Sequence, residues 1–151
     1  MPDGPADDPF DLERFVAAQA AVYDTALAEL RRGRKTTHWI WYVLPQLRGL
    51  GRSGRARHFG LSGLAEARAY LAHPLLGPRL HECVAALLTL PDTTAVAVLG
   101  EVDALKLRSC LTLFEAAAGA SGSDFERALI RYFGGRRDER SLCLLALPPP
   151  V

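Results

Sequence analysis

The chain has 151 residues, of which 49% are hydrophobic and 23% charged, and its formal net charge is +1. These values are close to globular averages, and the length suits one domain around a single core. The balanced charge argues against a dedicated nucleic-acid-binding protein, which usually carries a strong basic excess. No apolar run approaches the length of a membrane-spanning helix, so we expect no membrane segment.

The two ends of the chain have compositions typical of tails. Residues 1–8 contain proline and aspartate without the basic start of a secretory signal, and residues 148–151 contain three consecutive prolines. We therefore expect one domain over residues 9–147. The three cysteines are widely spaced and show no zinc-ligand pattern, which predicts reduced thiols, no metal, no cofactor and a cytoplasmic location.

Apolar residues recur every three or four positions along most of this domain, as in amphipathic helices. The first such pattern runs from Leu12 to Leu30, with Asp8 placed to cap it and Gly33 placed to end it. Further helices are predicted over residues 62–73, 80–88, 94–98, 102–114, 123–133 and 138–145. About seven short helices and no internal repeat predict a compact all-α bundle.

The segment from Arg31 to Gly60 is unusual in its charge. No acidic residue lies between Glu29 and Glu66, whereas eight of the eighteen basic residues of the chain lie there. Such a stretch attracts anions, and arginine can bind phosphate or carboxylate through two hydrogen bonds. A solvated basic rim would show the same pattern, so charge alone leaves both interpretations open.

Both tryptophans of the chain lie inside this basic segment, next to polar groups. Aromatic rings beside cations can hold a base or sugar above an anion, although core packing would account for roughly half of this aromatic surface. A lone histidine such as His38 is more often structural than catalytic. The residues predicted to bind a ligand here are Lys35, Trp39, Trp41, Gln46 and Arg52.

Three glycines follow the tryptophans with the spacing of a dinucleotide-binding motif, G-x-G-x-x-G. They are Gly49, Gly51 and Gly54. That motif requires a strand before it and a helix after it within alternating strands and helices, and the helical pattern provides neither context, so we reject it. The glycines instead predict a flexible loop whose amides can approach an anion.

Two polar residues interrupt apolar helix faces and should need partners. Gln19 lies in the first apolar stripe, and Lys106 lies between Asp103 and Ser109 on the fifth predicted helix. We expect Lys106 to converge on one pocket with residues of the basic segment, and Gln19 to line its wall. These residues are Lys35, His38, Trp41 and Gln46. The alternative is a plain surface ion pair between Lys106 and Asp103.

Several motifs make the sequence similar to a known family. They include His38-Trp39-Ile40-Trp41, Pro45-Gln46 with Gly49-Leu50-Gly51, Lys106-Leu107 with Ser109, and Phe133-Gly134-Gly135. Together they resemble the family catalogued as domain of unknown function 1810, over nearly the whole chain after the first tail. The resemblance implies a compact all-α fold, and it implies no reaction. Cys110 stands where this family usually has a second serine.

A shorter likeness concerns an acid, an aromatic residue and a following glutamine. Glu13, Phe15 and Gln19 are similar to such a group in the NADAR family of N-glycosidases, which act on ADP-ribose and related ribosyl compounds. This likeness implies hydrolysis of a ribosyl bond, although fragmentary analogy alone does not establish function.

The sequence therefore supports two hypotheses of different kinds. The first is a hydrolase for a ribosyl or nucleotide-like anionic substrate, in which Arg52 and Lys35 hold phosphate and Glu13 or Asp103 acts as general base. Its candidate catalytic residues are Glu13, His38 and Asp103, and its binding residues are Gln19, Lys35, Trp39, Trp41, Gln46, Arg52, Lys106 and Ser109. The second is a non-catalytic module that binds a protein or an anionic metabolite. Nucleic-acid binding is least favoured because the total charge is balanced.

Overall fold

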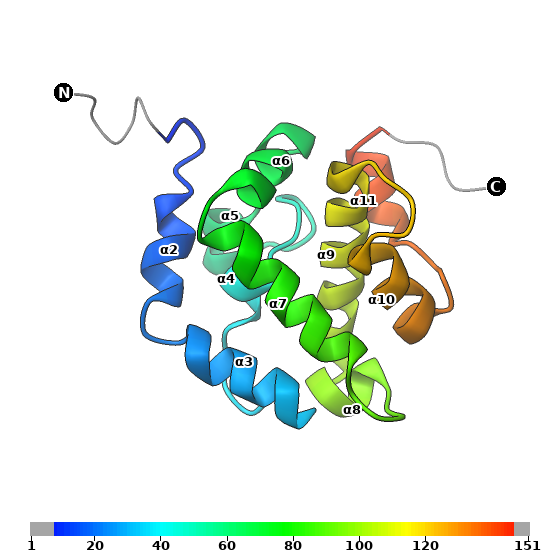
Figure 1. The fold of residues 1–151 in the computed structure, drawn as a ribbon. Helices are drawn as coiled ribbons and strands as arrows, with labels where there is room; N and C mark the ends of the chain where they lie inside the picture. Colours follow the sequence, from blue (N-terminus) through cyan, green and yellow to red (C-terminus); the bar gives the residue numbers. More distant parts are fainter. Residues whose placement is uncertain (1–7, 147–151) are drawn as a thin grey trace.

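The computed structural model describes residues 8–146, which form ten α-helices and no β-strand (Figure 1). The all-α prediction is confirmed, with more helices than the seven or so expected. The helices are α2 (Glu13–Gln19), α3 (Tyr23–Arg32), α4 (Ile40–Val43), α5 (Gly54–Phe59), α6 (Leu64–Ala72), α7 (Leu76–Leu88), α8 (Ala95–Leu99), α9 (Glu101–Ala118), α10 (Asp124–Phe133) and α11 (Glu139–Leu144).

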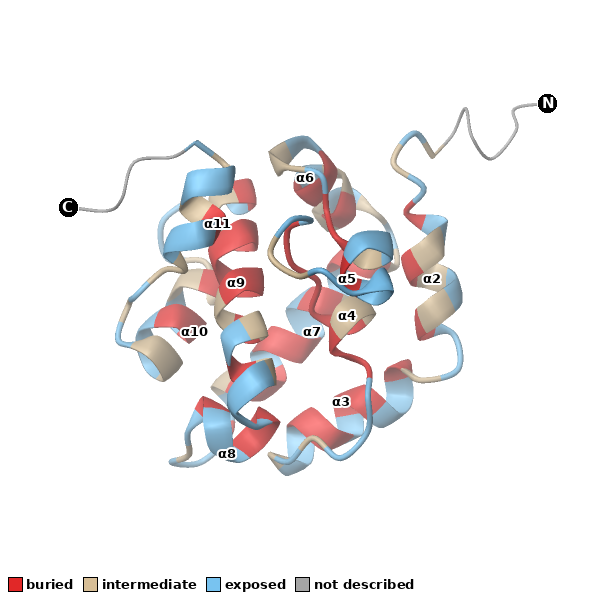
Figure 2. Ribbon diagram, turned by 180° about the vertical axis from the view of Figure 1, so that it is seen from behind, coloured by how far each residue is buried: buried red, intermediate tan, exposed pale blue. Residues whose placement is uncertain are grey.

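The longest helix, α9, is the central element of the fold. Helices α6, α8, α10 and α11 pack against it, and α7 packs against α3, α6 and α10. Buried positions face inward along α9 (Figure 2). A row of contacting aromatic rings crosses the core from α2 to α10, with centroid separations of 5.2 to 5.8 Å. The rings belong to Phe15, Tyr70, Phe114 and Phe125.

The predicted first helix is in fact two helices. Helix α2 ends at Gln19 and α3 begins at Tyr23, with a turn in which the Val22 amide donates to the Gln19 carbonyl. The residues between them include two alanines, which favour helix, so local sequence gives no sign of the break. The side chain of Gln19 is buried and bonded to other helices, as described below. The break between α2 and α3 therefore coincides with tertiary contacts of Gln19, and helix propensity does not predict it.

Three predicted helix starts are confirmed by side-chain capping contacts. The side chains of Thr94, Ser123 and Asp138 accept hydrogen bonds from the amides three residues later, at the starts of α8, α10 and α11. Other predicted ends were wrong: α6 begins at Leu64 and not at Ser62, α7 begins four residues before the predicted start, and α9 continues four residues beyond the predicted end. Ser62 instead binds the buried Glu66 carboxylate through both its amide and its hydroxyl.

The region around the three glycines contains more structure than a flexible loop. Ser53 caps α5, so Gly54 lies inside a helix, and only residues before it form a loop. An isolated bridge joins Leu47 to Leu61 on either side of this helix. The described residues contain no strand before the glycines, which agrees with the rejection of a dinucleotide-binding motif.

One glycine is required for close packing between α6 and α7. A β-carbon on Gly77 would lie 2.1 Å from the Leu71 carbonyl oxygen, far inside van der Waals contact. We expect Gly77→Ala to lower the free energy of unfolding by about 2 kcal/mol because the backbone must move. Gly54→Ala is the matched control, since a β-carbon at that position would meet no atom within 4 Å, and it should be neutral or stabilising. Equal effects in urea denaturation would contradict this packing argument.

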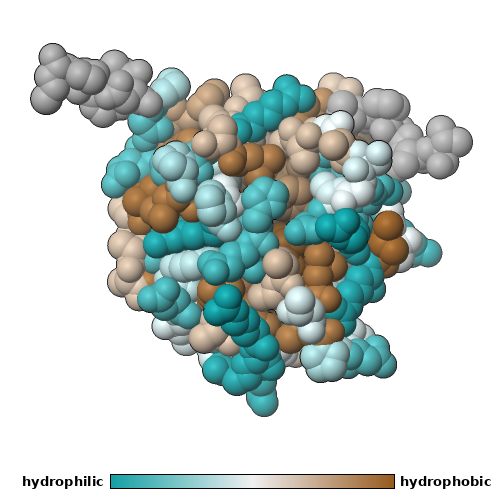
Figure 3. Space-filling view, in the orientation of Figure 1, coloured by the Kyte–Doolittle hydropathy of each residue, from teal (hydrophilic) through white to brown (hydrophobic). Residues whose placement is uncertain are grey.

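The surface of the face seen in Figure 1 is mixed in character. Hydrophilic and hydrophobic residues alternate over it without forming one continuous apolar area (Figure 3). No helix between residues 8 and 146 is long and apolar enough to cross a membrane.

Candidate functional site

The segment that leads from α3 to α4 is held in place by one buried acid. Gly33 ends α3 with a left-handed backbone, and the chain then turns back over Glu29. The Glu29 carboxylate accepts hydrogen bonds from the Trp39 indole at 2.9 Å and from backbone and hydroxyl groups of Thr36 and Thr37. Burial by itself would raise the pKa of Glu29, but these hydrogen bonds outweigh it and lower the pKa to about 2.

This turn presents Lys35 to the start of α9. The Lys35 amide donates to the Val98 carbonyl at 2.7 Å, which fixes the backbone against α8. The Lys35 side chain is only 6% exposed, and its ammonium nitrogen lies 2.9 Å from an Asp103 carboxylate oxygen. A buried lysine needs such a partner because an unpaired buried charge is costly.

Asp103 also binds a second lysine from its own helix. Lys106 lies 3.2 Å from the other carboxylate oxygen, and its ammonium nitrogen stands 3.9 Å from the centre of the Trp41 ring. That distance is well within the range of a cation–π contact. We call Lys35, Trp41, Asp103 and Lys106 the Asp103 cluster. It joins the basic segment to α9 and carries one more positive than negative charge.

The use of lysine at these two positions stands out against the rest of the chain. The eighteen basic residues comprise sixteen arginines and two lysines, and both lysines bind the same carboxylate. Lysine presents a compact ammonium group with three donors, whereas arginine presents a planar fork. The cluster therefore offers two ammonium groups side by side, each with donors beyond those that bind Asp103.

The glycine loop, residues 49–51, lies against this cluster. A β-carbon on Gly51 would lie 2.8 Å from the Ala56 β-carbon, which is too close, so glycine is required at this position. The same atom would lie 3.9 Å from the Trp41 ring, which shows that the loop lies beside this ring. On its other side, Arg140 of α11 reaches the carbonyl oxygens of Gly49 and Leu50 through contacts of 3.5 Å. The loop is thus held between Trp41 and α11.

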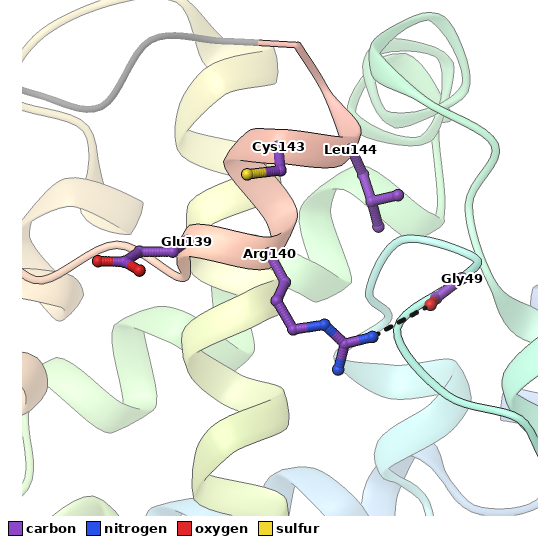
Figure 4. A pocket seen from close by; sticks show the side chains of 5 residues that line it. All are labelled: Gly49, Glu139, Arg140, Cys143 and Leu144. Carbon is purple, nitrogen blue, oxygen red and sulfur yellow. Dashed lines mark hydrogen bonds between the residues drawn. The ribbon is translucent and has the colours of Figure 1, made fainter.

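A pocket of about 310 Å³ opens between the glycine loop and α11 (Figure 4). Arg140 extends across it toward Gly49, and Leu144 also points to the loop. The thiol of Cys143 lies on the same helix and is exposed, whereas Cys83 and Cys110 are buried. Burial raises the pKa of both thiols, that of Cys83 to about 12, which makes both poor nucleophiles.

Three residues predicted for the site are not part of its accessible surface. The Trp39 ring lies 5.1 Å from the Lys35 ammonium nitrogen, but it is 1% exposed and bonded to Glu29, so it belongs to the core and is not presented to a ligand. Ser109 is buried and donates to the Leu105 carbonyl within its own helix. Glu13 is exposed on α2, and among the described residues no contact joins its carboxylate to the Asp103 cluster.

The remaining predicted residues border the cluster in sequence without bonding to it. His38 is exposed, and its carbonyl accepts from the Tyr42 hydroxyl. Gln46 is buried, and its carbonyl accepts from the Leu61 amide. Arg52 is exposed just after the glycine loop. Of the residues expected to share one pocket, Lys35, Trp41 and Lys106 therefore lie together, and no hydrogen bond joins His38 or Gln46 to Lys106 within residues 8–146.

The expectation for Gln19 was wrong in its partners. Its amide nitrogen donates to the Tyr42 carbonyl at 2.6 Å and contacts the Tyr70 hydroxyl at 3.2 Å, while Arg79 donates to its oxygen. These bonds tie α2 to α4, α6 and α7. Because its polar groups are engaged in this way, Gln19 acts as a buried structural connector and not as a partner of Lys106.

Two residues of the site were missed by the sequence reasoning. Glu29 shapes the basic segment from outside it, and Arg140 lies ninety residues after the loop that it contacts. Neither position has a local signal, since Glu29 falls beside the apolar stripe of α3 and Arg140 is one arginine among sixteen. Among the described residues, no group of histidine, cysteine, aspartate and glutamate side chains is placed to hold a metal ion.

Between residues 8 and 146 the chain is an all-α domain in which a basic, tryptophan-containing segment contacts the central helix α9. Residues 9–145 match the family described as "Protein of unknown function (DUF1810)", and the chain belongs to that family. The crystal structure of the conserved hypothetical protein Rv1873 from Mycobacterium tuberculosis is similar, with a TM-score of 0.90 and 51% sequence identity. The match covers 93% of this chain and 100% of that one. No curated protein matches the chain.

Proposed function

We propose that the protein handles a small ribosyl or nucleotide-like anion, which it binds at the Asp103 cluster. The observation that carries this proposal is the convergence of both lysines on one carboxylate beside a partly buried tryptophan, Trp41. A purely structural ion pair needs one lysine. The second leaves a local positive charge that a phosphate or carboxylate group would neutralise.

The surroundings of the cluster suit the other parts of such a ligand. The amides of the glycine loop lie next to Trp41, and backbone N–H groups of glycine-containing turns can bind anionic oxygens. Arg52 follows this loop directly in the sequence, and Arg140 contacts the Gly49 carbonyl oxygen from α11. The uncovered part of the Trp41 ring would contact a base or sugar, because aromatic rings commonly hold such planar or apolar faces.

We further propose that the reaction is hydrolysis of a glycosidic bond, with Asp103 as the general base. Water would attack the anomeric carbon and lose a proton to the Asp103 carboxylate, while the bond to the leaving group breaks and that group takes up a proton. Anion binding to Lys35 and Lys106 would draw both ammonium groups partly away from Asp103. His38, which is exposed at the end of the same turn, is the candidate donor to the leaving group.

A binding module without turnover is the second candidate, and one observation favours it. Each oxygen of Asp103 is engaged by an ammonium group, and the other candidate base, Glu13, lies apart from the cluster on α2. A base must have a free oxygen near water. The two candidates share the ligand and differ only in chemistry.

Calorimetric titration with ADP-ribose, NAD and ribose 5-phosphate tests the binding proposal. We expect binding of at least one compound, and a loss of about ten-fold or more in affinity for Lys106→Ala, because a charge-assisted hydrogen bond is removed. Arg55→Ala is the matched control, since this exposed arginine lies in the same basic segment on α5. Equal losses for both variants would indicate diffuse attraction, and no heat with any compound would refute the site.

Product analysis by chromatography separates the two candidates. If Asp103 is the base, Asp103→Asn should abolish release of the free base or leaving group while leaving ligand affinity within a few-fold of wild type. Wild-type protein that binds these compounds and releases no product would establish the binding module instead.

A further inference from the structure

A groove of about 470 Å³ is lined by the first half of α9, the start of α8 and the end of α10. Figure 1 shows where these three helices lie in the fold. Its volume is in the range of small-molecule sites. Most of its lining is apolar or aromatic, and two of the lining side chains, Val96 and Leu105, are 51% and 60% exposed. The remaining apolar lining comes from Ala95, Ala104, Tyr132 and Phe133.

Arg108 lines the same groove and stands out for its lack of partners. Its Nε atom is fully buried, and no group among residues 8–146 accepts a hydrogen bond from it. No carboxylate in the described part of the chain forms an ion pair with its guanidinium group. Its neighbour is the Phe133 ring, 5.9 Å away, at the outer limit of a cation–π contact. Buried polar groups are nearly always hydrogen-bonded, so this donor calls for an acceptor.

The groove is separate from the Asp103 cluster. An α-helix turns by about 100° per residue, so Arg108 and Asp103, five residues apart, lie about 140° apart around α9. The cluster faces α4, whereas the groove faces α8 and α10. A ligand in one place therefore does not contact the other.

We propose that this groove binds a monocarboxylic acid with an apolar body, such as a medium-chain alkanoate or an aryl-substituted propionate. The carboxylate accepts hydrogen bonds from the terminal nitrogens of the Arg108 guanidinium group, which has no acidic partner among residues 8–146. The alkyl or aryl part lies against Leu105, Val96 and Phe133 and removes their exposed apolar surface from water.

Glu101 also lines the groove and fixes the orientation of the ligand. It lies seven residues before Arg108 on α9, two helical turns or about 10 Å along the axis. A carboxylate at that end would meet a like charge. The acid group therefore lies at the Arg108 end, and a dicarboxylate of similar length binds less tightly.

The test is NMR and calorimetric titration of the full chain with octanoate and 3-phenylpropionate, each compared with its matching alcohol, and with octanedioate. We expect both monocarboxylates to shift the methyl signals of Val96 and Leu105 and to leave the Trp41 indole signal unchanged. Arg108→Gln should weaken binding about ten-fold or more. Arg68→Gln, on an exposed residue of α6 outside the groove, should not.

Three results would overturn the proposal. They are no binding of either monocarboxylate at millimolar concentration, equal binding of the alcohols, and undiminished binding by a folded Arg108→Gln variant. If that variant does not fold, Leu105→Glu decides the matter, since this exposed position tolerates a charge that would repel the ligand. Shifts at Val96 without shifts at Trp41 also separate this site from the Asp103 cluster, so the two proposals can fail independently.

Discussion

Replacement of Glu29 by alanine is expected to lower the free energy of unfolding by about 4 kcal/mol. The carboxylate is 2% exposed and is the acceptor for the indole of the fully buried Trp39 as well as for Thr36 and Thr37. Its removal leaves the indole donor without a partner in the core and releases the turn that positions Lys35. Urea denaturation measures the effect.

Glu13→Ala is the matched control for this substitution. Glu13 is an exposed glutamate in the first turn of α2, so its loss should cost less than about 1 kcal/mol. A similar loss for the two variants would mean that the hydrogen bonds to Glu29 contribute little.

The same carboxylate should make stability depend on pH. The pKa of Glu29 falls from 4.5 to about 2 on folding, so its ionised form stabilises the native state above pH 4.5 and this contribution disappears as the pH falls toward 2. The stability difference between wild type and Glu29→Gln is therefore expected to shrink between these values. A difference that is constant from pH 6 to pH 2 would show that the charge on Glu29 is not involved.

The second large effect is expected at Asp103. Asp103→Ala should destabilise the protein by about 3 kcal/mol, because Lys35 is left buried without its acidic partner. Adding Lys35→Met should restore most of the loss, since an apolar side chain of similar length can occupy the same space without a charge. Denaturation of the two single variants and the double variant measures the coupling between these residues.

The matched control for this cycle is Asp92→Ala, an exposed aspartate between α7 and α8. It should have little effect and should show no coupling to Lys35→Met. Additive losses for Asp103→Ala and Lys35→Met would contradict a buried ion pair and would weaken the case for the Asp103 cluster as a unit.

Local sequence predicted the parts of the fold that depend on local chemistry. The helix periods, the capping side chains of α8, α10 and α11 and the left-handed glycine at Gly33 appear as expected, because each acts within one or two turns of chain. The break after Gln19 was not predictable, since it accompanies bonds to Tyr42 and Tyr70, which are distant in sequence.

The candidate site was predictable to a similar degree. The three-residue spacing of Asp103 and Lys106 indicates an ion pair on one helix face, and the structure shows it. That Lys35 joins the pair depends on how the basic segment folds back over Glu29, for which no periodicity exists. The two tryptophans also could not be told apart, because Trp39 and Trp41 have similar neighbours in sequence and differ only in what packs over them.

Because both lysines pair with Asp103, chemical modification of lysine amines can report on the Asp103 cluster. Lys35 and Lys106 are the two lysines of the chain, so amine-directed acylating or reductively methylating reagents react at these two side chains and at the α-amino group. Lys35 is 6% exposed and Lys106 19%, which should make Lys106 react first. Mass spectrometry of proteolytic peptides would then follow occupancy of the cluster as protection of these two lysines from modification, without any substitution in the protein.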